Sequence, residues 1–180
     1  MPHLNGEVSY LLKKHARLFS ALNEGSEVLD LACGSGRNGL SLIESDMNVT
    51  FVDNSESALA EVFTKIQGKN RDRHQCLRID LEDGKFSLFD TRRFDVILVF
   101  KYLHRPLFPR IKSALSKGGL IFYETFTAEQ KKFGRPKNPS YLLRDNELLE
   151  NFGDWEIIDY FQGIKLDPQR AIASLVARKP

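Results

Sequence analysis

The pattern of apolar and polar positions predicts strands that alternate with helices along most of the chain. Short apolar runs typical of buried strands occur at residues 27–32, 49–53, 75–80, 94–100 and 119–124. Apolar residues at helical spacing predict helices over about 7–23, 37–44, 55–67, 106–116 and 144–151. Such alternation is typical of a parallel sheet with helices on both faces.

The last thirty residues follow a different pattern. Residues 155–161 and 171–177 resemble strands, and Gly163 and Asp167-Pro168 between them favour a turn, so we expect a closing antiparallel hairpin. The predicted fold is α/β, a Rossmann-like doubly wound sheet of about seven strands, mostly parallel with a C-terminal antiparallel hairpin. Residues 1–180 are expected to form a single domain. The loop at 126–143 is long enough to suggest a function.

Composition narrows the class of protein. The chain has 180 residues, of which 42% are hydrophobic and 28% charged, with a formal net charge of +2. This charge is too small to indicate a nucleic-acid or membrane partner. The start of the chain lacks the features of a secretory signal, so a cytoplasmic protein is expected. Cys33 and Cys76 have no close cysteine or histidine at metal spacing, so neither a disulfide framework nor a metal site is expected.

A glycine-rich segment is the first candidate for chemistry. Residues 34–39, Gly-Ser-Gly-Arg-Asn-Gly, match G-x-G-x-x-G directly after a predicted strand and before a predicted helix. Asp53 ends the next predicted strand, where its carboxylate could accept hydrogen bonds from ribose hydroxyls. Both a nicotinamide cofactor and S-adenosylmethionine would use such a residue. A tight turn without any ligand is the alternative.

Asp30 favours one of these cofactors over the other. It lies near the end of the first predicted strand, where a carboxylate would repel a pyrophosphate. S-adenosylmethionine has no phosphate and carries an ammonium and a sulfonium group. A carboxylate would stabilise it, either directly or by organising the turn and its water. The alternative is that Asp30 only bonds nearby backbone N–H groups.

Asp80 follows the third predicted strand, and Leu81 comes next. The carboxylate could accept from an adenine amino group, while Leu81 packs on the ring or donates its N–H to it. A turn or helix cap is the alternative. Successive strand ends thus carry Asp30, Asp53 and Asp80, and ligands bind at such ends in open parallel sheets.

These segments resemble the class I S-adenosylmethionine-dependent methyltransferases. Residues 28–36 resemble the first motif of the family, joined to Val52-Asp53 and to Ile79-Asp80-Leu81, and the resemblance extends from about 15 to 179. Residues 33–38 and 173–179 are most similar to the tellurite-resistance branch, near the thiopurine methyltransferases. Two positions depart from the family pattern: Ala32 replaces a usual glycine, and Lys117 replaces a frequent proline.

The resemblance implies S-adenosylmethionine as cofactor, with the 30–36 turn around its methionine portion, Asp53 at the ribose and Asp80 at the adenine. The expected cofactor residues are Asp30, Ala32, Cys33, Gly34, Ser35, Gly36, Asn38, Asp53, Asn54, Asp80, Leu81 and Phe100. The helix predicted at 7–23 could be a lid over the cofactor.

Methyl transfer from a sulfonium is an in-line displacement, so the protein mainly positions donor and acceptor. The expected acceptor-binding residues follow the fourth and fifth predicted strands and are Lys101, Tyr102, Arg105, Tyr123 and Glu124. His104 is the candidate catalytic base, because histidine readily exchanges protons near neutral pH. The alternatives are a surface or capping role for His104, a solvated Arg105, and local packing for Tyr123 and Glu124.

A small-molecule acceptor, such as a thiol or a chalcogen oxyanion, is the first hypothesis. Residues 99–102, Val-Phe-Lys-Tyr, replace the Asn/Asp-Pro-Pro-aromatic motif that methylates exocyclic base amines. The basic stretch at 131–137 could close over an acidic small molecule or contact RNA phosphates. RNA or protein methylation and a non-catalytic S-adenosylmethionine-binding module therefore stay as alternatives. A nicotinamide dehydrogenase is disfavoured by Asp30.

Overall fold

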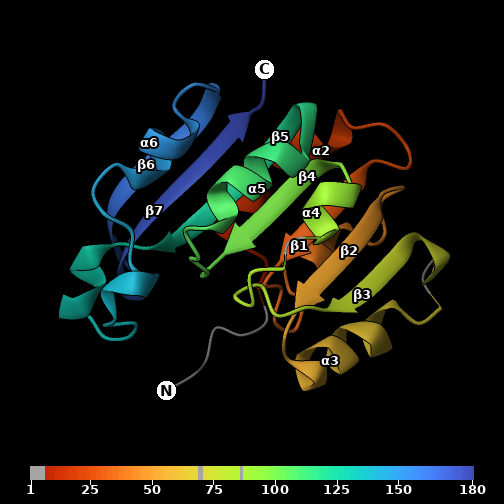
Figure 1. Ribbon diagram of the computed structural model, residues 1–180, viewed down its shortest axis with the longest axis horizontal. Helices are drawn as coiled ribbons and strands as arrows, with labels where there is room; N and C mark the ends of the chain where they lie inside the picture. Colours follow the sequence, from red (N-terminus) through yellow and green to blue (C-terminus); the bar gives the residue numbers. More distant parts are fainter. Residues whose placement is uncertain (1–6, 69–70, 86) are drawn as a thin grey trace. The chain divides into compact units, whose positions relative to one another are not determined.

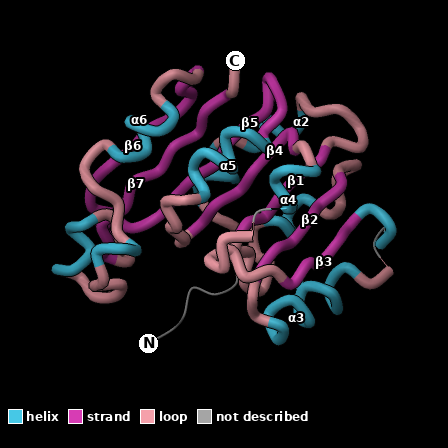
Figure 2. Tube along the Cα trace, viewed as in Figure 1, coloured by secondary structure: helices cyan, strands magenta, loops and turns pink. Residues whose placement is uncertain are grey.

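The computed structural model describes residues 7–68, 71–85 and 87–180. The first six residues, considered above for a secretory signal, lie outside this range. Within it, seven strands form a sheet in the order β3-β2-β1-β4-β5-β7-β6 (Figures 1 and 2). The strands are β1 Glu27–Leu31, β2 Asn48–Asp53, β3 His74–Arg78, β4 Phe94–Phe100, β5 Leu115–Phe126, β6 Glu156–Leu166 and β7 Gln169–Arg178.

The pairings confirm the predicted sheet. β1 pairs with β2 and β2 with β3 in parallel, whereas β7 pairs with both β5 and β6 in antiparallel fashion. The C-terminal hairpin turns between Leu166 and Gln169, close to the predicted Asp167-Pro168. The mostly parallel α/β fold with a closing antiparallel hairpin is therefore present.

The helices are shorter than the sequence pattern predicts. The α-helices of the described residues are α1 Tyr10–Lys14, α2 Ala16–Ser20, α3 Glu56–Ile66, α4 Ser87–Thr91, α5 Leu107–Ala114 and α6 Glu147–Phe152. Four single turns of 3₁₀-helix complete them: η1 Gly39–Leu42, η2 Arg71–Arg73, η3 Ala128–Lys132 and η4 Pro139–Tyr141. None of these helices is long and apolar enough to cross a membrane.

Two predicted helices need correction. The helix expected at 7–23 is two short helices, because the backbone of His15 (φ −109°, ψ 25°) departs from helical geometry. The helix expected at 37–44 is only the 3₁₀ turn η1. There the Ser41 N–H bonds the carbonyl three residues earlier, on Asn38, and Asp30 takes the Gly39 N–H. The helix α4 was not predicted; it has five residues and no clear apolar repeat.

The chain divides into two compact units. The first comprises residues 1–85 and 94–98, and the second 86–93 and 99–180. In the first unit the strands β1 and β2 are almost wholly buried, and α3 turns Leu59, Val62 and Ile66 inward. Ser55 caps α3 by accepting a hydrogen bond from the Ala58 N–H at 3.3 Å.

The second unit has its own core. Strand β7 is buried along most of its length between β5 and β6, and its helices contribute aromatic side chains. Phe152 of α6 packs edge-on against Phe108 of α5 and against Trp155, with ring centroids 5.9 and 5.1 Å apart. Each unit therefore buries an apolar core of its own.

Candidate functional site

The glycine turn follows β1 in the first unit. Gly34 (φ +55°) and Gly36 (φ +74°) both adopt the left-handed backbone region that favours glycine. A Cβ on Gly36 would lie 2.7 Å from Cγ2 of Val62, whereas a Cβ on Gly34 would meet nothing within 4 Å. The turn is therefore packed against α3 at Gly36 and open at Gly34, where a ligand can approach the backbone.

The third glycine of the motif, Gly39, serves close packing. Its N–H donates to Oδ2 of Asp30 at 2.8 Å. A Cβ on Gly39 would lie 2.5 Å from the Phe51 ring and 2.7 Å from the same Asp30 oxygen. Only a glycine lets this segment lie so close to β1 and β2, which is the role that the third glycine has in dinucleotide-binding turns.

Asp30 lies beneath the turn and is only 2% exposed. Burial raises its pKa to about 7, against the opposing effects of the Gly39 N–H and the Arg37 charge, while Asp53 raises it further. This geometry fits an Asp30 that organises the turn, and it fits equally the alternative in which Asp30 only bonds nearby backbone N–H groups. A carboxyl group with this pKa is partly protonated at neutral pH, so it repels a pyrophosphate less than the sequence argument assumed.

Asp53 links the end of β2 to the glycine turn. Its Oδ2 accepts the Gly34 N–H at 2.7 Å, and its Oδ1 accepts the Ser55 N–H at 2.9 Å. An ionised carboxylate has about four acceptor positions, so each oxygen of Asp53 can still accept another hydrogen bond. Asp53 is half-buried beside the open side of the turn, where ribose hydroxyls could donate to it.

Asp80 is exposed two residues after β3, and its Oδ1 accepts the Glu82 N–H at 2.9 Å. This is the turn geometry of the alternative interpretation, and it leaves Oδ2 for other partners. Leu81 is 6% exposed. Because β1, β2 and β3 pair in parallel, Asp30, Asp53 and Asp80 lie at the same edge of this part of the sheet.

The other turn residues have mostly structural contacts. Ala32 adopts φ 53°, the left-handed region, which explains why the family usually has glycine there. The Cys33 N–H donates to the Val52 carbonyl at 3.0 Å, and burial raises the pKa of the Cys33 thiol. Ser35 is half-buried.

Two further predicted cofactor residues lie around this turn. Asn38 is buried, and its Oδ1 accepts the Ser9 N–H at 3.0 Å, which ties the start of α1 to the glycine turn. Asn54 is exposed, and its carbonyl accepts from Arg78 at 3.3 Å. The contact at Asn38 is a connection between the turn and the N-terminal segment that the sequence pattern did not indicate.

The residues predicted around the transferred methyl group and the acceptor belong to the second unit, from the last residue of β4, Phe100, to Glu124 in β5. Phe100 is 8% exposed. Lys101 is exposed with φ 57°, and its N–H donates to the Glu124 carbonyl at 2.7 Å. A non-glycine residue in this region is strained, and such strain often occurs at functional sites. Tyr102, His104 and Glu124 are half-buried.

Tyr123 belongs to the core. It is 1% exposed, and burial raises the pKa of its hydroxyl above the usual value. Its ring lies 5.8 Å from that of Phe108, and its hydroxyl donates to the Tyr102 carbonyl at 3.2 Å. Its position is that of the local-packing alternative, and it holds the segment that carries Tyr102.

Arg105 forms an ion pair that the sequence did not predict. Its Nε and Nη2 donate to the two carboxylate oxygens of Glu147 at 2.7 and 2.9 Å, a bidentate pair. Glu147 is 2% exposed. In the sequence, the signal for this buried carboxylate is its position in a predicted helix, next to Leu148 and five residues before Phe152. The guanidinium expected to steer an anionic acceptor therefore has a structural partner.

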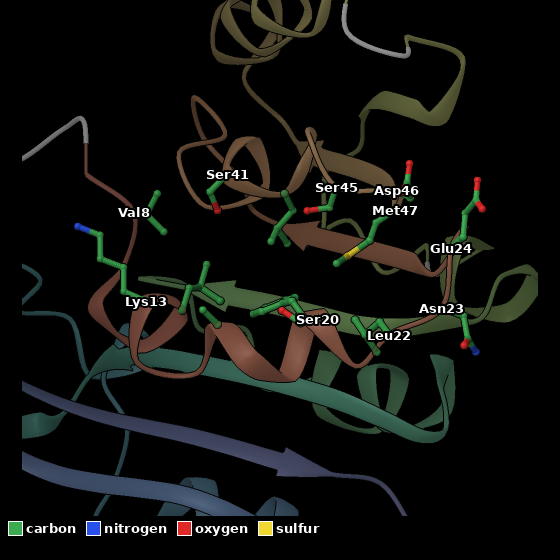
Figure 3. Close-up of a pocket in the computed structure, with 14 residues that line it drawn as sticks. Val8, Lys13, Ser20, Leu22, Asn23, Glu24, Ser41, Ser45, Asp46 and Met47 are labelled. Atoms are coloured by element: carbon green, nitrogen blue, oxygen red, sulfur yellow. The ribbon is translucent and has the colours of Figure 1, made fainter.

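A separate cavity of about 590 Å³ lies in the first unit beside the N-terminal helices (Figure 3). Its apolar walls include Leu12, Phe19, Leu42 and Met47. At one end lie Glu24 and Asp46, both paired with Arg73 at 3.0 and 3.4 Å. The described residues that line it include none of the predicted cofactor residues, so it is distinct from the glycine turn. Among the described residues, no group of three or more His, Cys, Asp or Glu side chains could hold a metal ion.

Comparison with known proteins agrees with this geometry. A family model described as a methyltransferase domain matches residues 4–179. A probable S-adenosyl-L-methionine-dependent methyltransferase, TehB of Haemophilus influenzae, is 29% identical over 143 residues, covering 74% of this chain and 47% of its own length. The chain thus spans about half the length of the curated relatives it matches.

Solved structures share the fold. The TehB structure from Haemophilus influenzae superposes with a TM-score of 0.69 at 22% identity, covering 95% of this chain and 66% of that one. A methyltransferase from Methanosarcina mazei gives a TM-score of 0.66 at 15% identity, covering 92% of this chain and 97% of that one. The predicted resemblance to the class I S-adenosylmethionine-dependent methyltransferases and their tellurite-resistance branch agrees with this similarity to TehB. Because the family model spans nearly the whole chain, the chain belongs to the methyltransferase-domain family.

Proposed function

We propose that the protein transfers the methyl group of S-adenosylmethionine to a small-molecule acceptor, such as a thiol or a chalcogen oxyanion. Membership of the family supports methyl transfer and this donor. The observation that carries the proposal is that the parallel strands β1, β2 and β3 end at the same edge of the sheet. There the glycine turn, open at Gly34, lies at the same edge as the carboxylates of Asp53 and Asp80. The carboxylates of this edge can accept hydrogen bonds from the hydroxyl and amino groups of a nucleoside, and family membership favours S-adenosylmethionine as that nucleoside.

The residues of this edge fit the donor. The free space at Gly34 allows the methionine portion to approach the turn formed by residues 32–36. The remaining acceptor positions of Asp53 suit the ribose hydroxyls, and Asp80 with Leu81 suits the adenine. When bound, the donor supplies an activated methyl group, so the chain needs only to position it and exclude water. We place Phe100 and Lys101 near that methyl group.

For the acceptor, we assign contact roles to Lys101, Tyr102 and Glu124, and the role of base to His104. The buried Tyr123 positions Tyr102 through its hydrogen bond to the Tyr102 carbonyl. Arg105 positions the loop at 126–143 through its hydrogen bond to the Leu142 carbonyl. Residues 99–102 lack the motif for base amines, which supports a small acceptor over RNA. The single domain, the lid role of residues 7–23 and the cytoplasmic location remain predictions.

The second candidate function is a non-catalytic S-adenosylmethionine-binding module, or an enzyme of this fold that catalyses a different reaction. One solved structure with this fold is described as a [4+2]-cyclase, SpnF, with a TM-score of 0.67 at 16% identity over 94% of this chain and 78% of that one. The fold therefore does not fix the reaction. An RNA or protein acceptor is a further alternative for the same donor.

A turnover screen separates these possibilities. Formation of S-adenosylhomocysteine is measured with thiols, tellurite or selenite, small organic anions, bulk RNA and a protein extract, for the native chain and for Asp53→Ala. We expect product with at least one small molecule and a marked decrease in Asp53→Ala. Product with RNA or protein alone would overturn the choice of acceptor, and donor binding without any turnover would support the binding module.

A further inference from the structure

The loop at 127–143 is fixed to the second unit at several points. Thr127 and Leu143 form a β-bridge at its base, and the Ala128 N–H donates to the Leu143 carbonyl at 3.0 Å. Gln130 is 5% exposed, accepting the Ala171 N–H of β7 at 2.9 Å and donating to the Arg135 carbonyl at 3.1 Å. The loop is therefore fixed in position by hydrogen bonds, as in the compact Ω-loops that often carry function.

Arg105 joins this loop to α6. Besides its pair with Glu147, it donates to the carbonyls of Ser140 and Leu142 at 3.1 and 2.9 Å. Burial alone would raise the pKa of Glu147, but the bonds from Arg105 and from the Arg144 N–H outweigh it and hold that pKa below its usual value. Four of the five N–H groups of Arg105 are thereby used, two on Glu147 of α6 and two on loop carbonyls.

A cavity of about 330 Å³ opens at this loop. Its charged lining residues are Arg105, Lys131 and Arg144, and Ser140 adds a hydroxyl group. The described residues that line it include no carboxylate side chain. Residues 127–144 contain five cationic residues and one acidic residue, Glu129, although the whole chain has a net charge of only +2. The segment that forms most of the cavity wall therefore carries an excess of positive charge.

The acidic neighbours leave two of these cations available. Glu147 neutralises Arg105, and Glu129 pairs with Lys132, which lies outside the cavity lining. Arg144 is paired with Glu150 at 3.1 Å, and its Nε lies 3.6 Å from Oε2 of Glu147, whose carboxylate Arg105 already binds at shorter distances. The Arg144 side chain is 69% exposed, so both of its pairs are weak. Lys131 has no ion-pair partner among the described residues. A small anion could therefore draw on Lys131 and Arg144 together.

We propose that this cavity binds the acidic group of the methyl acceptor, a small molecule bearing a carboxylate or an oxyanion. This inference rests on the function proposed above and narrows its substrate class. Lys131 and Arg144 would contact the anion, and Arg105 would act as a positioning residue that shapes the cavity. A hollow of this volume suits one acidic group of a small molecule, whereas nucleic acid binds along extended basic grooves with aromatic platforms.

The direct test is a titration with inorganic phosphate, monitored by the amide chemical shifts of the full chain. We expect saturable shifts confined to residues 127–144 in the native protein. Arg144→Gln and Lys131→Gln should each weaken phosphate binding roughly fivefold to tenfold, because each removes one charged donor. Lys132→Gln is the matched control, since it removes one charge from the same loop outside the cavity, and it should change the affinity less than about twofold.

Besides an absence of phosphate shifts, two results would overturn the proposal. One is an equal loss of binding in all three variants, which would show a diffuse charge effect. The other is a single-stranded RNA oligonucleotide that shifts amides well beyond the loop and displaces phosphate, which would favour a nucleic-acid surface. Calorimetry with S-adenosylmethionine on the same variants keeps the hypotheses separate: absent donor binding would refute the proposed function, and absent phosphate shifts would refute the anion site.

Discussion

The carboxylate of Asp53 holds the backbone of Gly34, with 2.7 Å between Oδ2 and the Gly34 nitrogen. One residue thus connects the end of β2 to the open part of the glycine turn, while keeping lone pairs for a ligand. Removing it should disturb both the turn and the ribose contact.

Asp53→Ala should weaken S-adenosylmethionine affinity at least about tenfold, because it removes charge-assisted hydrogen bonds to ligand and turn. Asp53→Asn keeps the shape and one acceptor oxygen, so a smaller loss is expected. Isothermal titration calorimetry measures both. Unchanged affinity in Asp53→Ala would mean that the ribose contact is misplaced.

The glycines of the turn should differ in their tolerance of a methyl group. Gly39→Ala should lower the free energy of unfolding by roughly 3 kcal/mol, because its Cβ would overlap Phe51 and Asp30. Gly34→Ala should cost about 1 kcal/mol, from its left-handed backbone alone. Chemical denaturation of the two variants gives the comparison. A loss in Gly34→Ala as large as in Gly39→Ala would contradict this packing.

Much of the sheet could be predicted, because buried parallel strands give continuous apolar runs such as 94–100. The helix at 37–44 could not be corrected from sequence, because the competing hydrogen bond, from the Gly39 N–H to the Asp30 side chain, depends on how the turn packs against β1. The break at His15 likewise has no glycine or proline to mark it. At residues 37–44 a contact with β1 thus outweighed local periodicity.

The candidate site was predictable in outline only. The motif located Gly34, Asp53 and Asp80, since strand ends of a parallel sheet meet at one edge. It could not show that Asp30 is buried beneath the turn or that Arg105 pairs with Glu147, because both depend on residues brought together by folding.

The raised pKa of Asp30 predicts a pH-dependent stability. The folded chain binds this proton more tightly than the unfolded chain, where an aspartate has its ordinary pKa near 4. The contribution of Asp30 to stability is therefore fullest below about pH 4 and is lost as the pH rises toward 7. The difference in unfolding free energy between the native chain and Asp30→Asn should fall by on the order of 2–4 kcal/mol over this range. A flat or rising difference would contradict the burial of a protonated Asp30.

The Arg105–Glu147 pair should matter more for stability than the exposed pair beside it. Arg105→Gln leaves the buried Glu147 carboxylate without its main partner, and the expected loss is about 2–4 kcal/mol. Arg144→Gln removes a mostly exposed guanidinium and should cost less than about 1 kcal/mol. Thermal or urea denaturation measures both losses. Equal losses would show that Glu147 does not depend on Arg105.

The most direct test of the account is calorimetry of the purified protein with S-adenosylmethionine, S-adenosylhomocysteine and NAD. We predict saturable binding of the first two at one site per chain and no detectable binding of NAD. Tight binding of NAD, with no heat from S-adenosylmethionine, would contradict the assignment of the carboxylate edge to a cationic methyl donor.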